Sequence, residues 1–193
     1  MNKRFIVFIS ILTLFCYSFK SQITNRILFI FDDSYSMYAP WKSDIKIEVA
    51  KKVMGEFLDS LENISNLELA LRCYGHTTFF KPDRNCQDSK LEVAFADAKT
   101  NSLKIKQRIQ RLEPLGTTPI AYSLGESAND FTACNHCRNI VILITDGIEE
   151  CNGNPCEVSA MLQKKGIYLR PFVIGVGLDA KFADIFACMG KFY

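Results

Sequence analysis

The stretch RILFIFDDSYSM, residues 26–37, decides the fold of this chain. Its apolar first half has the length of a strand, and it ends abruptly at the carboxylate of Asp32. The hydroxyls of Ser34 and Ser36 follow at once. We therefore interpret this stretch as a buried strand that delivers an oxygen-rich loop to the edge of a sheet.

The rest of the chain alternates predicted strands with predicted helices. Further strands are expected over 67–74, 91–95, 139–145 and 167–176, and helices over 44–61, 102–112, 120–131, 157–165 and 180–188. Ser43 or Asp44 is expected to cap the first helix, and Thr118 the helix that begins near Pro119. Such alternation predicts an α/β fold, a doubly wound, mainly parallel central sheet flanked by helices on both faces, as in Rossmann-like proteins.

The amino terminus has the pattern of a signal peptide. A basic start precedes an apolar run of 13 residues, 5–17, and a bilayer-spanning helix needs about 20. An uncleaved membrane anchor and a buried strand are the alternatives. We predict a signal peptide over 1–21 and a single domain over 22–193, exported to the periplasm, the cell surface or the medium, with no transmembrane segment in the mature chain.

The charge balance argues against nucleic acid as a partner. The chain has 23 basic and 21 acidic residues, and removal of residues 1–21 deletes Lys3, Arg4 and Lys20, which leaves 20 basic residues. The mature domain is therefore near neutral and has no basic field to attract a phosphate backbone.

Two carboxylates are predicted to meet at one edge of the sheet. Asp32 and Asp146 each follow a continuous apolar strand, and parallel strands end at a common edge where ligands bind. Ser34, Ser36 and Thr118 can add hydroxyl oxygens. Such a set suits Mg²⁺ best, with Mn²⁺ or Ca²⁺ as alternatives, and suits Zn²⁺ or copper poorly. Two aspartates at most neutralise the cation, and if one of them binds only through water the cation stays electron-poor. It would then accept an Asp or Glu carboxylate from a protein partner.

Most of the eight cysteines are expected to form disulfides after export. Cys151 and Cys156 can close a small loop beside the metal, and a disulfide is also expected for Cys134 and Cys137. The spacing disfavours zinc bound by all four, because the strand between the two pairs separates them by roughly 20 Å. Cys86 and Cys188 can join each other or the Cys134 pair. Cys73 is predicted to stay free on the buried face of a strand.

Three ordered motifs resemble those of the von Willebrand factor type A domain, particularly in exported bacterial members. They are the DxSxSM pattern of residues 32–37, GTTP at 116–119 and ITDG at 144–147, and the similarity covers Arg26 to Tyr193. The resemblance implies a metal-ion-dependent adhesion site made of Asp32, Ser34, Ser36, Thr118 and Asp146.

The chain departs from the family pattern at two positions beside this site. Tyr35 stands where the family often has Gly, and Asn154 where it often has Asp. We assign Tyr35 and His76 to a ligand-binding rim, and we expect Asp33 to be flanking surface.

The leading functional hypothesis is a secreted or surface binding module, not an enzyme, that captures an acidic ligand group through its cation. A Mg²⁺-dependent phosphoryl-transfer enzyme with Asp32 as nucleophile is the alternative, although Ser34 stands where such enzymes carry a second acid. A structural subunit of an envelope complex, with a vestigial metal site, is the third hypothesis.

Overall fold

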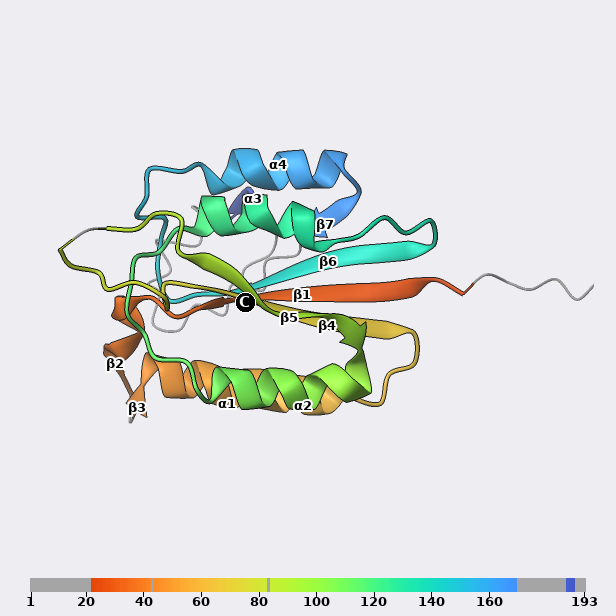
Figure 1. Cartoon of the computed structure of the whole chain (residues 1–193), viewed down its shortest axis with the longest axis horizontal. Coiled ribbons are helices and arrows are strands. Elements are labelled where there is room, and N and C mark those ends of the chain that lie inside the picture. Colours follow the sequence, from red (N-terminus) through yellow and green to blue (C-terminus); the bar gives the residue numbers. More distant parts are fainter. Residues whose placement is uncertain (1–21, 43, 83, 170–186, 190–193) are drawn as a thin grey trace, which may run out of the picture.

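A five-stranded sheet in the order β5-β4-β1-β6-β7 forms the centre of the molecule (Figure 1). The computed structural model describes residues 22–42, 44–82, 84–169 and 187–189. All neighbouring strands are parallel except β5, which runs antiparallel to β4 at one edge. The strands are β1 (Thr24–Asp32), β4 (Leu67–Tyr74), β5 (Ser89–Asp97), β6 (Cys137–Ile144) and β7 (Ile167–Leu169).

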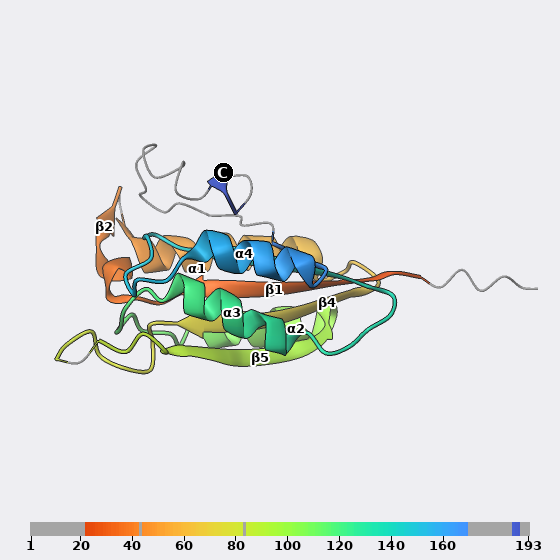
Figure 2. The ribbon, with the colours of Figure 1, turned by 90° about the horizontal axis from the view of Figure 1, so that it is seen from above.

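Helices cover both faces of the sheet (Figures 1 and 2). One face packs against α1 (Lys46–Leu61) and α2 (Ala98–Ile109), and the other packs against α3 (Ile120–Asp130) and α4 (Pro155–Lys164). The prediction of a doubly wound, mainly parallel sheet is therefore confirmed.

The central strand β1 contributes to two separate hydrophobic cores. Phe29 and Phe31 join the core under α1 and α2, whereas Leu28 and Ile30 join the core under α3 and α4. All four side chains are fully buried. Successive side chains of a strand point to opposite faces, and each such burial contributes about 1.5–3 kcal/mol before the cost of ordering the chain. This explains why the strand is apolar throughout.

The first helix begins differently from the prediction. Residues Pro40–Trp41 and Asp44–Ile45 form a small antiparallel ladder, β2–β3, so α1 starts only at Lys46. Its N-cap is Ile45, which makes no side-chain capping bond, and Asp44 instead accepts a hydrogen bond from the Ile45 amide. Asp44 is therefore not the cap, and Ser43 lies outside the described residues.

Other boundaries also differ from the prediction. The edge strand β5 is longer than the predicted 91–95, and α2 starts earlier than 102, because Asp97 caps it by accepting from the Thr100 amide at 3.0 Å. The predicted strand 167–176 is seen only as β7, and its remainder lies outside the described residues. The predicted signal peptide and nearly all of the predicted helix 180–188 also lie outside the described residues.

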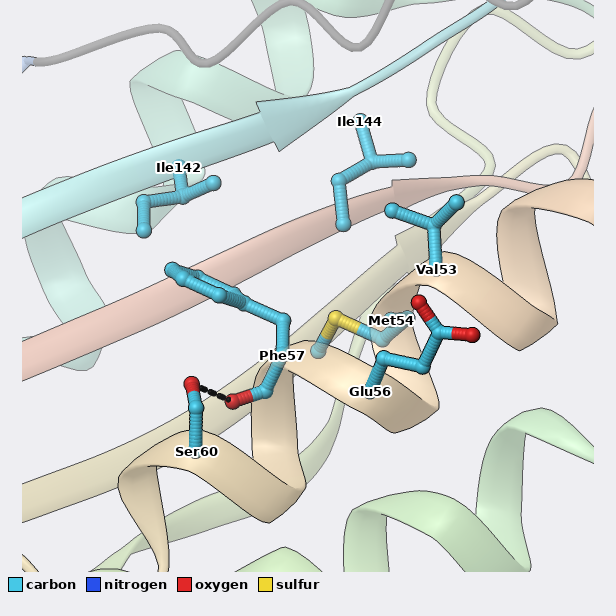
Figure 3. Close-up of a pocket in the computed structure, with 7 residues that line it drawn as sticks. All are labelled: Val53, Met54, Glu56, Phe57, Ser60, Ile142 and Ile144. Carbon is cyan, nitrogen blue, oxygen red and sulfur yellow. Dashed lines mark hydrogen bonds between the residues drawn. The ribbon is translucent and has the colours of Figure 1, made fainter.

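An apolar pocket of about 350 Å³ lies between α1 and β6. Figure 3 shows Val53 and Phe57 of the helix directed toward Ile142 and Ile144 of the strand, with Glu56 as the charged residue of the lining. Its lining contains none of the predicted metal ligands.

The loops that follow β1 and β4 project from the same end of the sheet, on the left in Figures 1 and 2. Strand β4 lies on one side of β1 in the sheet, and β6 lies on its other side. This is the topological switch point of an open parallel sheet, where ligands bind at the carboxyl ends of the strands.

Candidate metal centre

Asp32 ends β1 with its carboxylate completely buried. Its Oδ1 accepts from the Ser34 amide at 2.8 Å, and its Oδ2 accepts from the Thr145 hydroxyl at 2.5 Å. The Tyr74 hydroxyl in turn donates to Thr145 Oγ1 at 3.0 Å. A buried chain of hydrogen bonds from three strand ends therefore orients this carboxylate.

The loop hydroxyls connect Asp32 to Asp146. Ser34 Oγ lies 3.0 Å from Ser36 Oγ, and Ser36 Oγ donates to Asp146 Oδ1 at 2.8 Å. Asp146 and Ser34 are buried and Ser36 is exposed, so the cluster opens to solvent at Ser36. The structure thus brings four of the five predicted ligands into one hydrogen-bonded group.

The Thr118 hydroxyl reaches the same place from the third loop. A Cβ added to Gly147 would lie 3.9 Å from Ser36 Oγ and 4.0 Å from Thr118 Oγ1. The Ser36 and Thr118 hydroxyls therefore both lie close to Gly147, which places Thr118 beside the hydrogen-bonded group.

Close backbone contact holds these loops together. Ser34 forms an isolated parallel bridge with Gly116, and the Tyr35 amide donates to the Gly116 carbonyl at 2.9 Å. Gly75 has φ +73°, and a Cβ there would lie 2.8 Å from Ser34 Cα and 2.7 Å from the Thr117 carbonyl oxygen. Only glycine allows the loop after β4 to approach so closely.

Thr118 does not cap α3, contrary to the prediction. The N-cap position is Pro119, which makes no side-chain capping bond. Glu149 takes over this role, because its Oε2 accepts from the Ala121 amide at 2.7 Å and its Oε1 accepts from the Cys151 amide at 2.7 Å. The helix start is satisfied from another loop, which leaves the Thr118 hydroxyl available to the cluster.

The electrostatics of the cluster favour a bound cation. Burial, together with the negative charge of Asp146, raises the pKa of Asp32 from 3.8 to about 6, although hydrogen bonds from Ser34 and Thr145 oppose this. Lys46 Nζ lies 2.7 Å from Asp146 Oδ2 and supplies one positive charge. Two buried carboxylates with neutral hydroxyls between them suit a hard divalent cation.

The candidate ligand atoms of the cluster are all oxygens. Across the part of the chain that the structure describes, no three His, Cys, Asp or Glu side chains gather in a metal-binding group. The present cluster has two carboxylates, and its remaining oxygens are hydroxyls, which is a donor set for Mg²⁺, Mn²⁺ or Ca²⁺.

Asp33 is buried, so its assignment to the flanking surface was wrong. Neither carboxylate oxygen accepts a hydrogen bond from any described residue. Burial, followed by the charge of Asp32, raises the pKa of Asp33 from 3.8 to about 8, which favours its protonated form at neutral pH.

The two predicted rim residues differ in their placement. Tyr35 is 60% exposed beside the hydroxyls of the cluster. The His76 side chain is only 4% exposed and its Nε2 lies 2.9 Å from Glu92 Oε1, so His76 is an inward-facing residue and not part of the rim.

The disulfides differ from the predicted pairing. Cys151 joins Cys86, which ties the loop after β4 to the loop after β6, and Cys156 joins Cys188. The predicted Cys151–Cys156 loop is therefore wrong, as are both partners considered for Cys86 and Cys188. The Cys134–Cys137 disulfide forms as predicted, and Cys73 is the free, buried cysteine of the described residues.

Sequence reasoning missed four residues that shape the site: Tyr74, Thr145, Lys46 and Glu149. Thr145 had a signal, since it lies directly before Asp146 in the third motif. Lys46 and Glu149 had none, because their partners belong to loops that only the fold brings near.

Asn154, the second departure from the family pattern, caps α4 by accepting from the Cys156 amide at 3.1 Å.

Several solved structures share this fold. They include BatB from Bacteroides thetaiotaomicron, with a TM-score of 0.60 and 18% identity over 77% of this chain and 65% of that chain. The pilus adhesin SpaC from Lactobacillus rhamnosus GG has a TM-score of 0.69 and 12% identity over 90% of this chain and 29% of that chain. Proximal thread matrix protein 1 from the mussel byssus, with a zinc-occupied MIDAS motif, has a TM-score of 0.65 and 19% identity over 88% of this chain and 40% of that chain. The chain thus spans less than two thirds of each, and these identities establish the fold alone.

Sequence comparisons establish the family. The Bacillus subtilis proteins YwmD and YwmC are 29% and 27% identical to this chain over 164 residues, which is 84% of this chain and 72% and 70% of those proteins. The family model for the von Willebrand factor type A domain matches residues 27–190. Because this match covers most of the sequence, the chain belongs to the von Willebrand factor type A domain family.

Proposed function

We propose that this chain is an exported binding module that captures an acidic group of a protein ligand through a divalent cation. The observation that carries the proposal is the hydrogen-bonded path from Asp32 through Ser34 and Ser36 to Asp146, which opens to solvent at Ser36. Lys46 supplies only one positive charge to two buried carboxylates that repel each other, and such an arrangement is costly to maintain, so the cluster suggests a binding role.

Each residue has a distinct part in this proposal. Asp32 and Asp146 would provide charge, and Ser34, Ser36 and Thr118 would provide neutral oxygens, so the set would at most neutralise the charge of a divalent cation. When bound, the cation supplies an open position for an anionic oxygen. Thr145 holds the Asp32 carboxylate in one orientation. This chain therefore needs no bond-breaking step to act.

Mg²⁺ is the proposed ion, with Mn²⁺ and Ca²⁺ as alternatives. The oxygen-only donor set supports this choice. Proximal thread matrix protein 1 of the mussel byssus holds zinc in its MIDAS motif, so Zn²⁺ belongs in the same titration. SpaC is a pilus adhesin, which supports an adhesive role by analogy of fold only.

The disulfides support export. Cys86–Cys151 and Cys156–Cys188 join distant segments, and such bonds persist in oxidising compartments. The signal peptide over 1–21 and the domain over 22–193 are part of the proposal. Among the described residues, no helix is long and apolar enough to cross a membrane.

Calorimetric titration of the disulfide-bonded chain tests the metal assignment. Wild type and Asp59→Ala, an exposed acid on α1, should bind Mg²⁺ alike, whereas Asp146→Asn should lose binding. Equal heats from wild type and Asp146→Asn would refute the assignment. Hydrolysis of a phosphate ester that disappears in Asp32→Asn would instead favour phosphoryl transfer.

A further inference from the structure

We infer that the chain reads a second feature of its ligand, a large apolar side chain next to the acidic residue. The recognition element is an aromatic groove, which we define by Tyr35, Tyr38, Phe79, Phe80, Pro114 and Leu115. This inference rests on the proposed function, because the acidic residue of the ligand would be held at the candidate metal centre.

The groove has the size and chemistry of a side-chain pocket. Its volume is about 390 Å³, and aromatic rings form most of its wall. The rings of Tyr35 and Phe80 are stacked with centroids 6.2 Å apart, and the Tyr38 ring meets Tyr35 edge-on at 6.1 Å. Phe79 is 71% exposed and Tyr38 is also exposed. Grouped exposed aromatic side chains of this kind mark interaction sites in soluble proteins.

The groove and the metal centre are built from the same loops. Tyr35 lies between Ser34 and Ser36, and Leu115 directly precedes the Gly116–Thr118 segment. Neighbouring residues of an extended peptide lie only about 3.8 Å apart at Cα. A ligand whose carboxylate reaches the centre would therefore place a nearby side chain against the groove.

The loop that carries Phe79 and Phe80 is held in place before any ligand arrives. The Phe80 amide donates to the Leu115 carbonyl at 2.7 Å. The buried Asp88 carboxylate accepts from the amides and hydroxyls of Thr77 and Thr78. The Cys86–Cys151 disulfide fastens the end of the loop. A pre-organised aromatic surface loses little entropy on binding, which favours affinity.

The charges around the groove match an acidic peptide. Lys81 lines the groove and the Arg84 guanidinium lies 5.1 Å from the centre of the Phe80 ring, while Glu113 is an acid whose charge reaches Tyr38. Arg84 also faces Glu150 at 3.6 Å, but its side chain remains about half exposed. Cationic groups at the rim steer a negatively charged partner and do not favour a cationic one. The occupant we propose is thus an acidic peptide segment with a Phe, Tyr or Leu close to its Asp or Glu.

A peptide series tests this inference with the full disulfide-bonded chain. Each capped, fluorescently labelled peptide carries one Asp in a Gly-Ser background. A single Phe is placed in turn at each position before and after this Asp. Matched peptides carry Ser instead of Phe. In Mg²⁺, the best Phe peptide should bind at least about tenfold tighter than its Ser counterpart, as expected for burial of one aromatic side chain.

Two matched variants test whether the aromatic groove causes the preference for the Phe peptide. Phe79→Ser should remove the preference for Phe while leaving Mg²⁺ affinity and the Ser peptide unchanged. Tyr168→Ser, at a position on β7 that is 59% exposed, should change nothing. Circular dichroism verifies that both variants are folded. A preference for Phe that survives in Phe79→Ser would overturn the inference.

The outcomes separate this inference from the proposed function. Mg²⁺-dependent binding of every Asp peptide without a preference for Phe would overturn only the aromatic groove. Peptide binding that persists undiminished in chelator and in Asp146→Asn would overturn the metal-dependent function. Groove-dependent binding of a malto-oligosaccharide or of phosphatidylcholine vesicles, with no peptide bound, would also overturn the inference.

Discussion

Lys46 Nζ lies 2.7 Å from Asp146 Oδ2, so the first residue of α1 places a positive charge inside the candidate metal centre. The Asp146 side chain is fully buried, and Lys46 is its salt-bridge partner in the described part of the structure. A buried carboxylate without a partner is costly. Lys46 therefore stabilises the cluster when no cation is present, and it opposes a cation by charge repulsion.

Lys46→Met should tighten Mg²⁺ binding, because it removes the competing charge but keeps the apolar stem. We expect about a tenfold gain, which corresponds to about 1.4 kcal/mol. In chelator, the same variant should unfold at a lower temperature, since Asp146 loses its partner, and Mg²⁺ should restore the difference. Lys52→Met, exposed on the same helix, is the control. Unchanged or weaker Mg²⁺ binding by Lys46→Met would contradict the assigned role.

Thr145→Val should weaken both the fold and the metal centre. It removes the hydroxyl that donates to Asp32 at 2.5 Å and leaves the Tyr74 hydroxyl without its acceptor. Urea denaturation in chelator should show a loss of about 1–3 kcal/mol in the free energy of unfolding. Tyr74→Phe keeps the bond between Thr145 and Asp32, so its Mg²⁺ affinity should stay closer to that of wild type. Equal losses of Mg²⁺ affinity in the two variants would speak against orientation of Asp32 by Thr145.

The Cys86–Cys151 disulfide should stabilise the chain more than Cys134–Cys137 does. The two bonds close segments with sequence separations of 65 and 3, and a longer loop restricts the unfolded chain more. Replacing Cys86 and Cys151 together by Ser should cost about 2–4 kcal/mol in urea denaturation. The same replacement at Cys134 and Cys137 is the control and should cost less. A larger cost at Cys134 and Cys137 would show that native contacts outweigh the loop effect.

Acid should destabilise the chain partly through Glu92. Burial raises the pKa of Glu92, but hydrogen bonds from Arg108, His76 and Lys90 outweigh burial and lower the pKa from 4.5 to about 2. The folded state therefore holds fewer protons than the unfolded state between these values. The contribution of Glu92 to stability is present above pH 4.5 and is lost as the pH falls toward 2.

Glu92→Gln tests this assignment. The variant should be less stable than wild type near neutral pH, and the difference should shrink as the pH falls from 4.5 toward 2. Thermal unfolding across this range measures it, with the exposed Glu113→Gln as control. A difference that does not change with pH would show that Glu92 acts through packing and not through its charge.

The sequence by itself determined the layered α/β fold and predicted the five proposed metal ligands. The apolar run of β1 requires burial on both faces, and the alternation of helical and strand periods requires helices around a parallel sheet. Asp32 and Asp146 end such strands, so the edge at which they meet follows from the direction of the strands. These inferences depend on local patterns, which the sequence records directly.

Only the tertiary structure decided how side chains from distant loops combine. Glu149 caps α3 in place of Thr118, Cys86 reaches Cys151, and Lys46 reaches Asp146. Each pair depends on where loops of irregular conformation pack, and no periodicity in the sequence encodes that. Asp33 illustrates the same limit, because it is buried near Lys51 of α1 and Arg108 of α2, and its place after a strand does not record that.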